Sequence, residues 1–411
     1  MSRQLEIAVY HNLHSGGAKH SSYEIVSRLA ARHRVDLFCP STANTDFFDM
    51  RSHVGETVVF DYAPGRLFHS PFGRLNQAVR CRDLLRLEQV ERQIAAEIDR
   101  RGYDAVYVHP CQFTQTPSLL FYMHTPSLYH SREPFRRLYE PSIPRDYRSS
   151  QGWRDTLDRV DPFNRAYERW LRRMDRRNIR QATRIVTNSF FTREALYRVY
   201  GVNARVVYHG VDVETFRPLD LPRDNLALSV GALTPNKGFD FIVDSLGLIP
   251  ERLRPTLVVV SNYQELAERA YLERLARERG VHLTLLKGVS LEELVRLYNS
   301  AALICYAPIL EPFGLVPLEA MACGTAVVAV REGGVRESVV DGWTGFLVDR
   351  DPALFANAVQ TLLEDRALAA RLGCQAREYV TEKWTWDHTV QDVEAHLFDI
   401  LDRKELSPEA L

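Results

Sequence analysis

The sequence predicts an α/β protein of two domains, each built on a doubly wound parallel sheet. Its 411 residues are enough for two or three domains. Short, uniformly apolar segments alternate with helical ones, which is typical of strands covered by helices on both faces of a sheet. A loop around Pro218 and Pro222 separates two such series. Because strand–helix–strand crossovers are almost always right-handed, each series should wind into its own sheet.

The composition excludes several classes of protein. Lys and Arg number 52 against 53 Asp and Glu, so the net charge of -1 does not indicate a nucleic-acid partner. No apolar run approaches the ~20 residues that cross a bilayer, and the N-terminus turns polar too early for a signal peptide. None of the six cysteines lies in a CxxC or at zinc-ligand spacing. We therefore expect reduced thiols and a cytoplasmic location.

The first series opens with an apolar strand at 6–10 and the turn HNLHSGG. A helix is expected at 18–33, because Ile25, Leu29 and Ala30 share one face at helical spacing. A second apolar strand follows at 35–39 and completes a βαβ unit. Further strands are predicted at 58–60, 105–108, 119–122, 184–187 and 206–208, and helices at 81–101, 163–181 and 191–200.

The alternation is cleaner in the second series, after the two prolines. Strands are predicted at 227–230, 256–260, 282–286, 303–306, 326–329 and 346–348. Helices are predicted at 238–248, 264–279, 291–300, 315–322 and 352–363. The two domains should therefore join near 205–222.

The region 131–184 is rich in arginine and poor in strand signals. One helical stripe there is apolar and consists of Phe163, Tyr167, Trp170, Leu171 and Met174. Two interpretations stay open. The stripe packs inward and the arginines are solvated, or the basic face meets anionic lipid or an acidic acceptor. The second interpretation would place the protein at the inner membrane face as a peripheral protein.

The motif EPFGLVPLE at 311–319 carries the strongest functional signal. It follows an apolar strand and opens a helix, with Phe313 and Gly314 at the turn. A glycine there lets a ligand approach the backbone. The amides of Gly314, Leu315 and Val316 would be unpaired donors at the positive end of the helix. Since ligands of open α/β sheets bind at the carboxyl ends of strands, the motif predicts a phosphate site.

Two carboxylates flank this predicted phosphate site. Glu311 precedes the turn, and Glu319 lies more than one helical turn beyond it. The two side chains could bind hydroxyl-bearing groups on either side of a diphosphate. The alternative is that both are exposed surface charges.

Lys237 and a pair of glycines extend the predicted anion site. In VGALTPNKGFD the lysine stands at the start of a helix, where its charge is unfavourable unless an anion is held there. The alternative is a surface lysine. Gly16 and Gly17 follow the first strand and could admit a phosphate or a sugar to the next helix. Their turn is not a GxGxxG motif, so a dinucleotide site is not indicated.

Two further strand ends are candidates. His124, in YMHTP, closes an apolar run before a proline, so we expect it in a loop at the carboxyl end of a strand. Gly333 and Gly334 follow another apolar strand and repeat the strand–turn–helix geometry of an anion site.

No metal site is predicted. Asp349 and Asp351 form a D-x-D pair of the kind that holds a divalent cation in some enzymes. Asp351 precedes Pro352, however, and that order is typical of a helix N-cap followed by a proline in the first helical position.

Taken together, the chain resembles the retaining glycosyltransferases of family 4, which have the GT-B fold. The resemblance rests on SGG after the first strand, HTP in the first half, NSFFTREALYRVYG and VVYHGVDVETFRP at the junction, and VGALTPNKG, EPFGLVPLEAMACGTAVVA and GGVRESVVDGWTGFLV in the second half. It implies two Rossmann-like domains facing a central cleft. The acceptor domain would span 1–208, with a C-terminal helix at 385–404 returning to it, and the donor domain would span 209–384. The HTP segment and the arginine-rich helix are most similar to the mannosyltransferase-like branch.

The resemblance also implies a role for each candidate. Glu319 would bind the donor ribose, Glu311 the hydroxyls of the transferred sugar, and Lys237 the diphosphate. His124 would lie near the sugar and the acceptor, and Gly17 would cover the phosphates. The implied reaction moves a hexose from a UDP- or GDP-sugar to a hydroxyl of a glycan, a lipid-linked acceptor or a small molecule, with retention, without metal or cofactor. Polysaccharide biosynthesis is the implied setting.

The chain departs from the family at Ala232, where an arginine is common. Charged hydrogen bonds contribute roughly 1.5–3 kcal/mol each. Stabilisation of the leaving group would therefore rest on Lys237 and helix amides unless another cation substitutes. Three other functions stay open: a catalytically silent nucleotide-sugar-binding protein, a GT-B epimerase or phosphorylase, and a membrane-surface scaffold built on 131–184.

Overall fold

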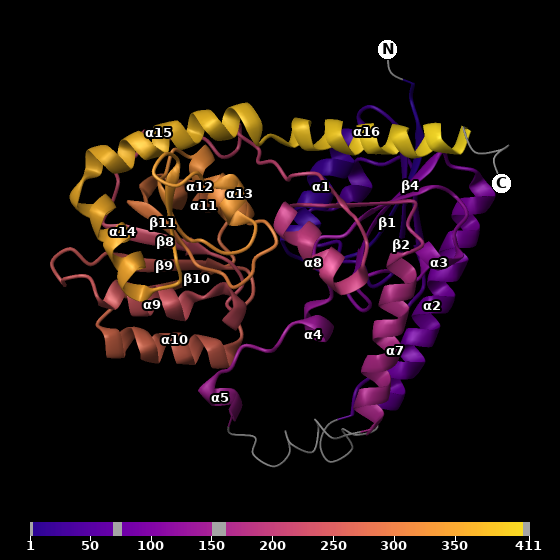
Figure 1. The fold of residues 1–411 in the computed structure, drawn as a ribbon, viewed down its shortest axis with the longest axis horizontal. Coiled ribbons are helices and arrows are strands. Elements are labelled where there is room, and N and C mark those ends of the chain that lie inside the picture. Colours follow the sequence, from indigo (N-terminus) through magenta and orange to yellow (C-terminus); the bar gives the residue numbers. More distant parts are fainter. Residues whose placement is uncertain (1–2, 69–75, 150–161, 406–411) are drawn as a thin grey trace.

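The computed structural model describes residues 3–68, 76–149 and 162–405 and confirms two α/β domains with parallel sheets (Figure 1). The strands of the first domain are β1 (Glu6–Asn12), β2 (Arg34–Pro40), β3 (Thr57–Phe60), β4 (Ala105–Cys111), β5 (Ser127–His130), β6 (Arg184–Thr187) and β7 (Arg205–Val206). Its helices are α1 (Gly17–Ala30), α2 (Asn76–Arg101), α3 (Leu119–Tyr122), α4 (Arg136–Tyr139), α5 (Asp146–Ser149), α7 (Pro162–Ile179) and α8 (Phe190–Tyr200).

The strands of the second domain are β8 (Leu226–Val230), β9 (Thr256–Ser261), β10 (Leu283–Lys287), β11 (Leu303–Tyr306), β12 (Val327–Val330) and β13 (Gly345–Val348). A 3₁₀ turn, η3 (Pro235–Lys237), precedes the helices α9 (Phe239–Gly247), α10 (Leu266–Arg279), α11 (Leu291–Ser300), α12 (Leu315–Ala322), α13 (Val335–Ser338), α14 (Pro352–Glu364) and α15 (Arg366–Lys383). The last helix, α16 (Trp386–Glu405), follows α15 after a short break.

Both sheets are doubly wound. The strand order is β3-β2-β1-β4-β5-β6-β7 in the first sheet and β10-β9-β8-β11-β12-β13 in the second. Neighbouring strands pair in parallel throughout. In each sheet the order reverses beside the first strand of the domain, and such switch points are where open α/β sheets bind ligands.

One predicted strand is wrong, and the error displaces a candidate residue. Residues 119–122 form the helix α3, and the central strand is β5, which lies between β4 and β6. A short apolar run such as LLFY does not distinguish a strand from a buried helical turn. Pairing decides the matter, because the Pro126 carbonyl accepts from the Val106 amide at 2.8 Å and aligns the residues after it with β4. Helix α15 was also absent from the sequence prediction.

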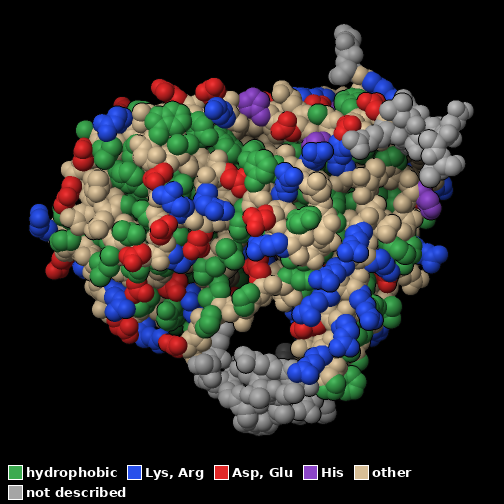
Figure 2. Space-filling model, viewed as in Figure 1, with side chains coloured by type: hydrophobic (Ala, Val, Ile, Leu, Met, Phe, Trp, Pro, Cys, Tyr) green, Lys and Arg blue, Asp and Glu red, His purple; other side chains and the backbone are tan. Residues whose placement is uncertain are grey.

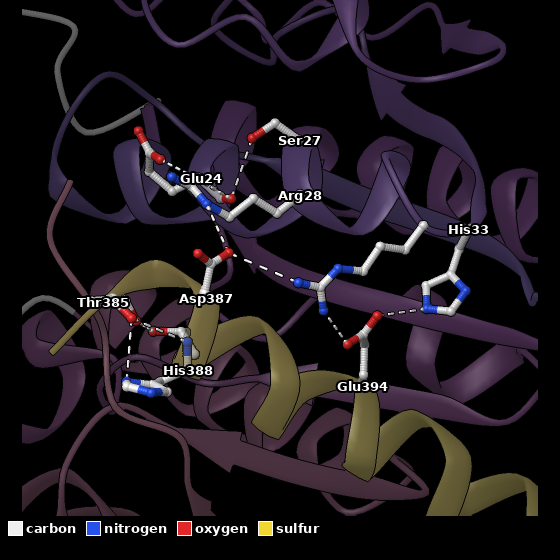
Figure 3. Close-up of polar contacts among 10 residues, drawn as sticks. Glu24, Ser27, Arg28, His33, Thr385, Asp387, His388 and Glu394 are labelled. Carbon is white, nitrogen blue, oxygen red and sulfur yellow. Dashed lines mark hydrogen bonds and ion pairs between the residues drawn. The ribbon is translucent and has the colours of Figure 1, made fainter. Parts of the chain in front are cut away.

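Helix α16 lies on the first domain beside α1 (Figure 1). Its apolar face completes the core under α1 and β1, and consists of Trp386, Val390, Val393, Leu397 and Ile400. Polar contacts flank this face (Figure 3): Glu394 accepts from Arg32 at 2.7 Å and lies 3.0 Å from His33 Nε2. The chain therefore crosses between the domains twice.

The two crossings lie against each other. The Val211 amide donates to the Trp384 carbonyl at 2.8 Å. A Cβ on Gly210 would lie 2.2 Å from the carbonyl carbon of Thr385, so only glycine lets the segments pass so closely. The two crossings therefore form one closely packed connection between the domains.

Helix α7 agrees with the first interpretation of the arginine-rich region, in which an apolar stripe packs inward and the arginines are solvated. Tyr167, Leu171 and Met174 are buried on its inner face, whereas Phe163 is 71% exposed and does not belong to the packed stripe. The outer face is basic and exposes Arg165, Arg169, Arg172, Arg173 and Arg176, and the exposed Arg180 directly follows the helix. Figure 2 shows basic side chains clustered along this part of the first domain.

All six cysteines are unpaired, and four of them are buried: Cys39, Cys111, Cys305 and Cys323. Within the described residues, no helix has the length and apolar character that a membrane span requires.

Candidate functional site

The loop between β11 and α12 has the shape of an anion site. Gly314 caps the helix with φ +97°, a conformation that favours glycine, and a Cβ there would lie 2.6 Å from the Tyr306 hydroxyl oxygen. The first turn of α12 contains no acidic residue, and no side chain caps it. Phe313 is buried, and Leu315 packs against the core of the first domain. The open start of α12, which includes Val316, therefore faces the other domain.

Lys237 and Glu311 meet at this loop. Lys237 ends η3, and its Nζ lies 2.8 Å from Glu311 Oε2. Burial alone would raise the pKa of Glu311, but the charges of Lys237 and Arg136 outweigh it, so that this pKa is lowered. Glu311 is therefore ionised at neutral pH, and Lys237 is the cation bonded to it.

Glu319 is buried on the inner side of α12. Its Oε2 accepts from the Tyr298 hydroxyl at 2.6 Å. Burial raises the pKa of Glu319, while the charge of His20 opposes the shift. Because His20 belongs to α1, Glu319 lies within electrostatic reach of the first domain.

Gly16 and Gly17 form the start of α1, across from Glu319. Gly16 caps the helix with φ +150°, and neither a side-chain cap nor an acidic residue occupies its first turn. A Cβ on either glycine would meet no atom within 4 Å. Packing therefore does not require these glycines, and the space beside them is open to a ligand.

His124 does not lie at the carboxyl edge of the sheet, and this expectation is wrong. It precedes β5, at the amino end of the strand, because the apolar run before it is helix α3. Its side chain is 93% exposed, and its Nδ1 lies 3.0 Å from Asp99 Oδ2. The structure thus separates His124 from Lys237 and Glu311.

Two other histidines occupy the position expected for His124. His109 and His130 lie at the carboxyl ends of β4 and β5 and are fully buried. His109 Nδ1 lies 3.1 Å from the Ser22 hydroxyl of α1, and its Nε2 is buried without a hydrogen-bond partner in the described part of the chain. Burial and the charge of Arg132 lower the pKa of His109, so its ring is neutral.

The same signal could have found His109. The segment AVYVHP is an apolar strand that ends in a histidine before a proline, and it was already predicted as a strand. Nothing local distinguishes that histidine from the one in YMHTP. The two histidines can be distinguished only once the next strand is known to be β5, which begins after His124.

Gly333 and Gly334 support the site by packing. A Cβ on Gly333 would lie 2.3 Å from the Glu311 carbonyl oxygen, and one on Gly334 would lie 2.2 Å from that of Pro312. The Gly334 amide donates to the Glu311 carbonyl at 2.9 Å. The expected strand–turn–helix order is present, because the two glycines lie between β12 and α13, and their close contacts also fix the position of the β11–α12 loop.

Asp351 is a helix cap. Its side chain accepts from the amides of Ala353 at 2.8 Å and Leu354 at 3.1 Å at the start of α14. Over residues 3–68, 76–149 and 162–405, no three His, Cys, Asp or Glu side chains are grouped as a metal site would require.

Known proteins resemble the chain along most of its length. A model described as glycosyltransferase family 4 matches residues 15–215, and one described as glycosyl transferases group 1 matches 213–379. A D-inositol 3-phosphate glycosyltransferase of Stackebrandtia nassauensis is 31% identical over 274 residues, covering 61% of this chain and 60% of that protein. Its counterpart in Acidothermus cellulolyticus is 36% identical over 236 residues, covering 52% of each. The chain thus spans about half the length of the curated relatives it matches.

Solved structures share the fold over nearly the whole chain. Sucrose-phosphate synthase from Thermosynechococcus elongatus superposes with a TM-score of 0.72 at 22% identity, covering 98% of this chain and all of that one. Anabaena HepE in complex with UDP and glucose superposes with a TM-score of 0.69 at 20% identity, covering 96% and 100%. At this identity the likeness shows the GT-B fold. Because the two family models together extend from residue 15 to residue 379, the chain belongs to the family 4 glycosyltransferases.

Proposed function

We propose that the protein transfers a hexose from a nucleotide diphosphate sugar to an acceptor hydroxyl, with retention of anomeric configuration. The observation that carries this proposal is the Lys237–Glu311 pair at the open start of α12, facing the first domain. A solved structural neighbour binds UDP-glucose, and the relatives above are named for an inositol phosphate. These names support a UDP-sugar as donor and a small polyol as acceptor, while a GDP-sugar donor and a glycan or lipid-linked acceptor are proposed from the sequence resemblance alone.

The chemistry follows from the charges that line the proposed site. The bond between C1 of the sugar and the diphosphate oxygen breaks, and its electron pair stays on the diphosphate. Lys237 and the amides of Gly314, Leu315 and Val316 stabilise that charge as preorganised donors. The acceptor oxygen then bonds to C1 on the same face, and its proton passes to the departing phosphate oxygen. Closure of the two domains excludes water and limits hydrolysis of the donor. No metal ion takes part in this scheme.

The carboxylates and His109 orient the substrates in this proposal. Glu319 binds the ribose and Glu311 the hydroxyls of the transferred sugar. His109 replaces His124 as the group near the sugar, because it is neutral and its buried Nε2 is unpaired in the part of the chain that the structure describes. A neutral imidazole can donate to or accept from a sugar hydroxyl without adding charge.

A panel of UDP-, GDP- and ADP-sugars tests the proposed function by mass spectrometry. Transfer to inositol phosphate, a glycan or a lipid-linked acceptor supports it, and the productive donor identifies base and sugar together. Tight binding without transfer or hydrolysis would instead support the catalytically silent protein. Interconversion of the sugar while it is still attached to the nucleotide would support an epimerase.

His109→Ala is expected to lower the turnover number roughly 10- to 100-fold, because one oriented hydrogen bond to the sugar is lost. His124→Ala should stay within about twofold of the wild type, since a side chain so exposed contributes little. Steady-state kinetics with a saturating donor measures both. A larger loss in the His124 variant than in the His109 variant would reverse this assignment.

The outer face of α7 supports a second element of the proposal, a peripheral contact with anionic lipid. Each exposed arginine near such a surface contributes about 1 kcal/mol at low ionic strength. Arg169→Gln/Arg173→Gln should therefore float with phosphatidylglycerol-containing vesicles at least ~10-fold less well than the wild type. Arg252→Gln/Arg296→Gln, two exposed arginines of the second domain, is the matched control. Equal flotation of the two double variants, or binding to pure phosphatidylcholine, would contradict the contact.

A further inference from the structure

A strained residue precedes the candidate sugar-binding carboxylate. Leu310 has φ +49°, one of only three non-glycine residues with positive φ in the described part of the chain. Leucine disfavours this region because its Cβ crowds the backbone. The Leu310 side chain is 40% exposed, so its own packing is a weak restraint on the backbone. Something else must hold the turn that presents Glu311, because strain of this kind persists only where surrounding contacts over-determine it.

The first domain provides that restraint through Arg136. Its Nη2 donates to the Leu310 carbonyl at 2.5 Å, and its Nη1 lies 3.5 Å from the Ile309 carbonyl oxygen. Its Nε donates to Glu133 at 2.5 Å, which orients the planar guanidinium. The fork of Arg136 therefore spans two successive carbonyls of the opposite domain, directly before Glu311.

Two first-domain hydroxyls bind the same loop on the other side of Glu311. Ser189 Oγ donates to the Pro312 carbonyl at 2.5 Å, and Thr192 Oγ1 does so at 3.2 Å. Both belong to the start of α8. The backbone that carries Glu311 is thus held from across the domain boundary on both sides of this residue.

The segment that carries Arg136 is itself anchored on the second domain. We call residues 133–149, which include α4 and α5, the arm; it reaches from the first domain toward α10 (Figure 1). Arg145 binds Asp240 and Glu268, each at 2.9 Å, and Tyr147 donates to Glu268 at 2.6 Å. Arg145 and Glu268 are both buried, and breaking such a pair leaves an uncompensated charge. Asp240 lies in the first turn of α9, three residues after Lys237.

We propose that Arg136 is a positioning residue that makes the orientation of Glu311 depend on domain closure. In the closed arrangement Arg136 stabilises the strained Leu310, and Glu311 points at Lys237. When the domains part, the Leu310 carbonyl loses its donor, the backbone relaxes to negative φ, and the carboxylate turns away. The inference deepens the proposed function, since Glu311 is its sugar-contacting group. It also assigns the first domain a direct part in ordering the donor site.

Kinetics of paired variants tests the inference. Arg136→Gln should lower kcat/KM for the donor about tenfold, whereas Arg137→Gln, its exposed neighbour in α4, should match the wild type within about twofold. Glycine adopts positive φ without strain. Leu310→Gly should therefore restore Arg136→Gln to within about threefold of the wild type. A purely structural role of Arg136 in α4 would not respond to a glycine in the other domain.

Hydrogen–deuterium exchange supplies a readout that needs no substrate. Amides of the loop 307–314 should exchange faster in Arg136→Gln than in Arg137→Gln, while the core strands β8 and β11 keep their protection. Normal exchange and normal kinetics in Arg136→Gln, or a loss that Leu310→Gly does not reduce, would overturn the inference and leave the proposed function standing. If the wild type transfers no sugar, the proposed function fails, and the exchange comparison alone decides whether Arg136 orders the loop.

Discussion

Lys237→Ala is expected to lower the turnover number roughly 100- to 1,000-fold, the size of effect seen when one preorganised donor to a developing charge is removed. Two features make this residue the most sensitive position. It is the cation bonded to Glu311 at the start of α12, and Ala232 occupies the position where the family often has a second one. Lys287→Ala, an exposed lysine of the same domain, should be as active as the wild type. Near-normal turnover of Lys237→Ala would remove the central electrostatic role.

A second variant separates two causes of that loss. Lys237→Ala also leaves Glu311 without its bonded partner, and an unpaired buried carboxylate could disturb the loop by itself. Lys237→Ala/Glu311→Gln removes the unpaired charge but does not return the cation. Because Glu311→Gln also weakens the contact to the sugar, the double variant is compared with Glu311→Gln alone. If leaving-group stabilisation is the cause, removing Lys237 still costs roughly 100-fold in the Glu311→Gln background. Recovery of most activity would instead assign the loss to the stranded carboxylate.

The stability of the protein should depend on pH through Glu91, a fully buried carboxylate of α2 that accepts from the Tyr10 hydroxyl of β1 at 2.5 Å. Burial raises the pKa of Glu91 to about 7, although hydrogen bonds from Tyr10 and Ser118 act against the shift. In the unfolded chain a glutamate titrates near ~4.3. At a pH between these two pKa values, the folded protein keeps the proton on Glu91, whereas the unfolded chain releases it. The stabilisation that the protonated Glu91 contributes is therefore fully present below the unfolded pKa. It is lost as pH rises through the folded pKa.

Glu91→Gln mimics the protonated carboxyl and should abolish this pH dependence. A shift from about 4.3 to about 7 corresponds to about 4 kcal/mol at 1.36 kcal/mol per pKa unit. Urea unfolding of both proteins between pH 4 and pH 8 should show wild type and variant equally stable at the acid end, with the variant gaining on the wild type by about that amount toward pH 8. Parallel stability curves would mean that Glu91 stays ionised in the folded protein.

The fold was largely predictable because its information is local. Uniformly apolar segments of strand length alternate with helical periodicities, and this alternation identified every strand of the second domain and most of the first. The same holds for the turn at Gly314 before α12, since the positive φ there is a requirement of the backbone itself. A position with positive φ, or one in close contact with a carbonyl, favours glycine, and that glycine is visible at a single position of the sequence.

Contacts between segments that are distant in sequence could not be predicted from any single position of the chain. The run LLFY is equally compatible with a strand and with a helical turn. Only the pairing of β5 between β4 and β6 shows that His124 lies at the amino edge of the sheet, whereas His109 lies at the carboxyl edge. The strain at Leu310 and its relief by Arg136 join residues 174 positions apart. Periodicity and turn chemistry act over one or two turns of chain, whereas the charges and donors that complete this site come from opposite domains and meet only when both sheets have formed.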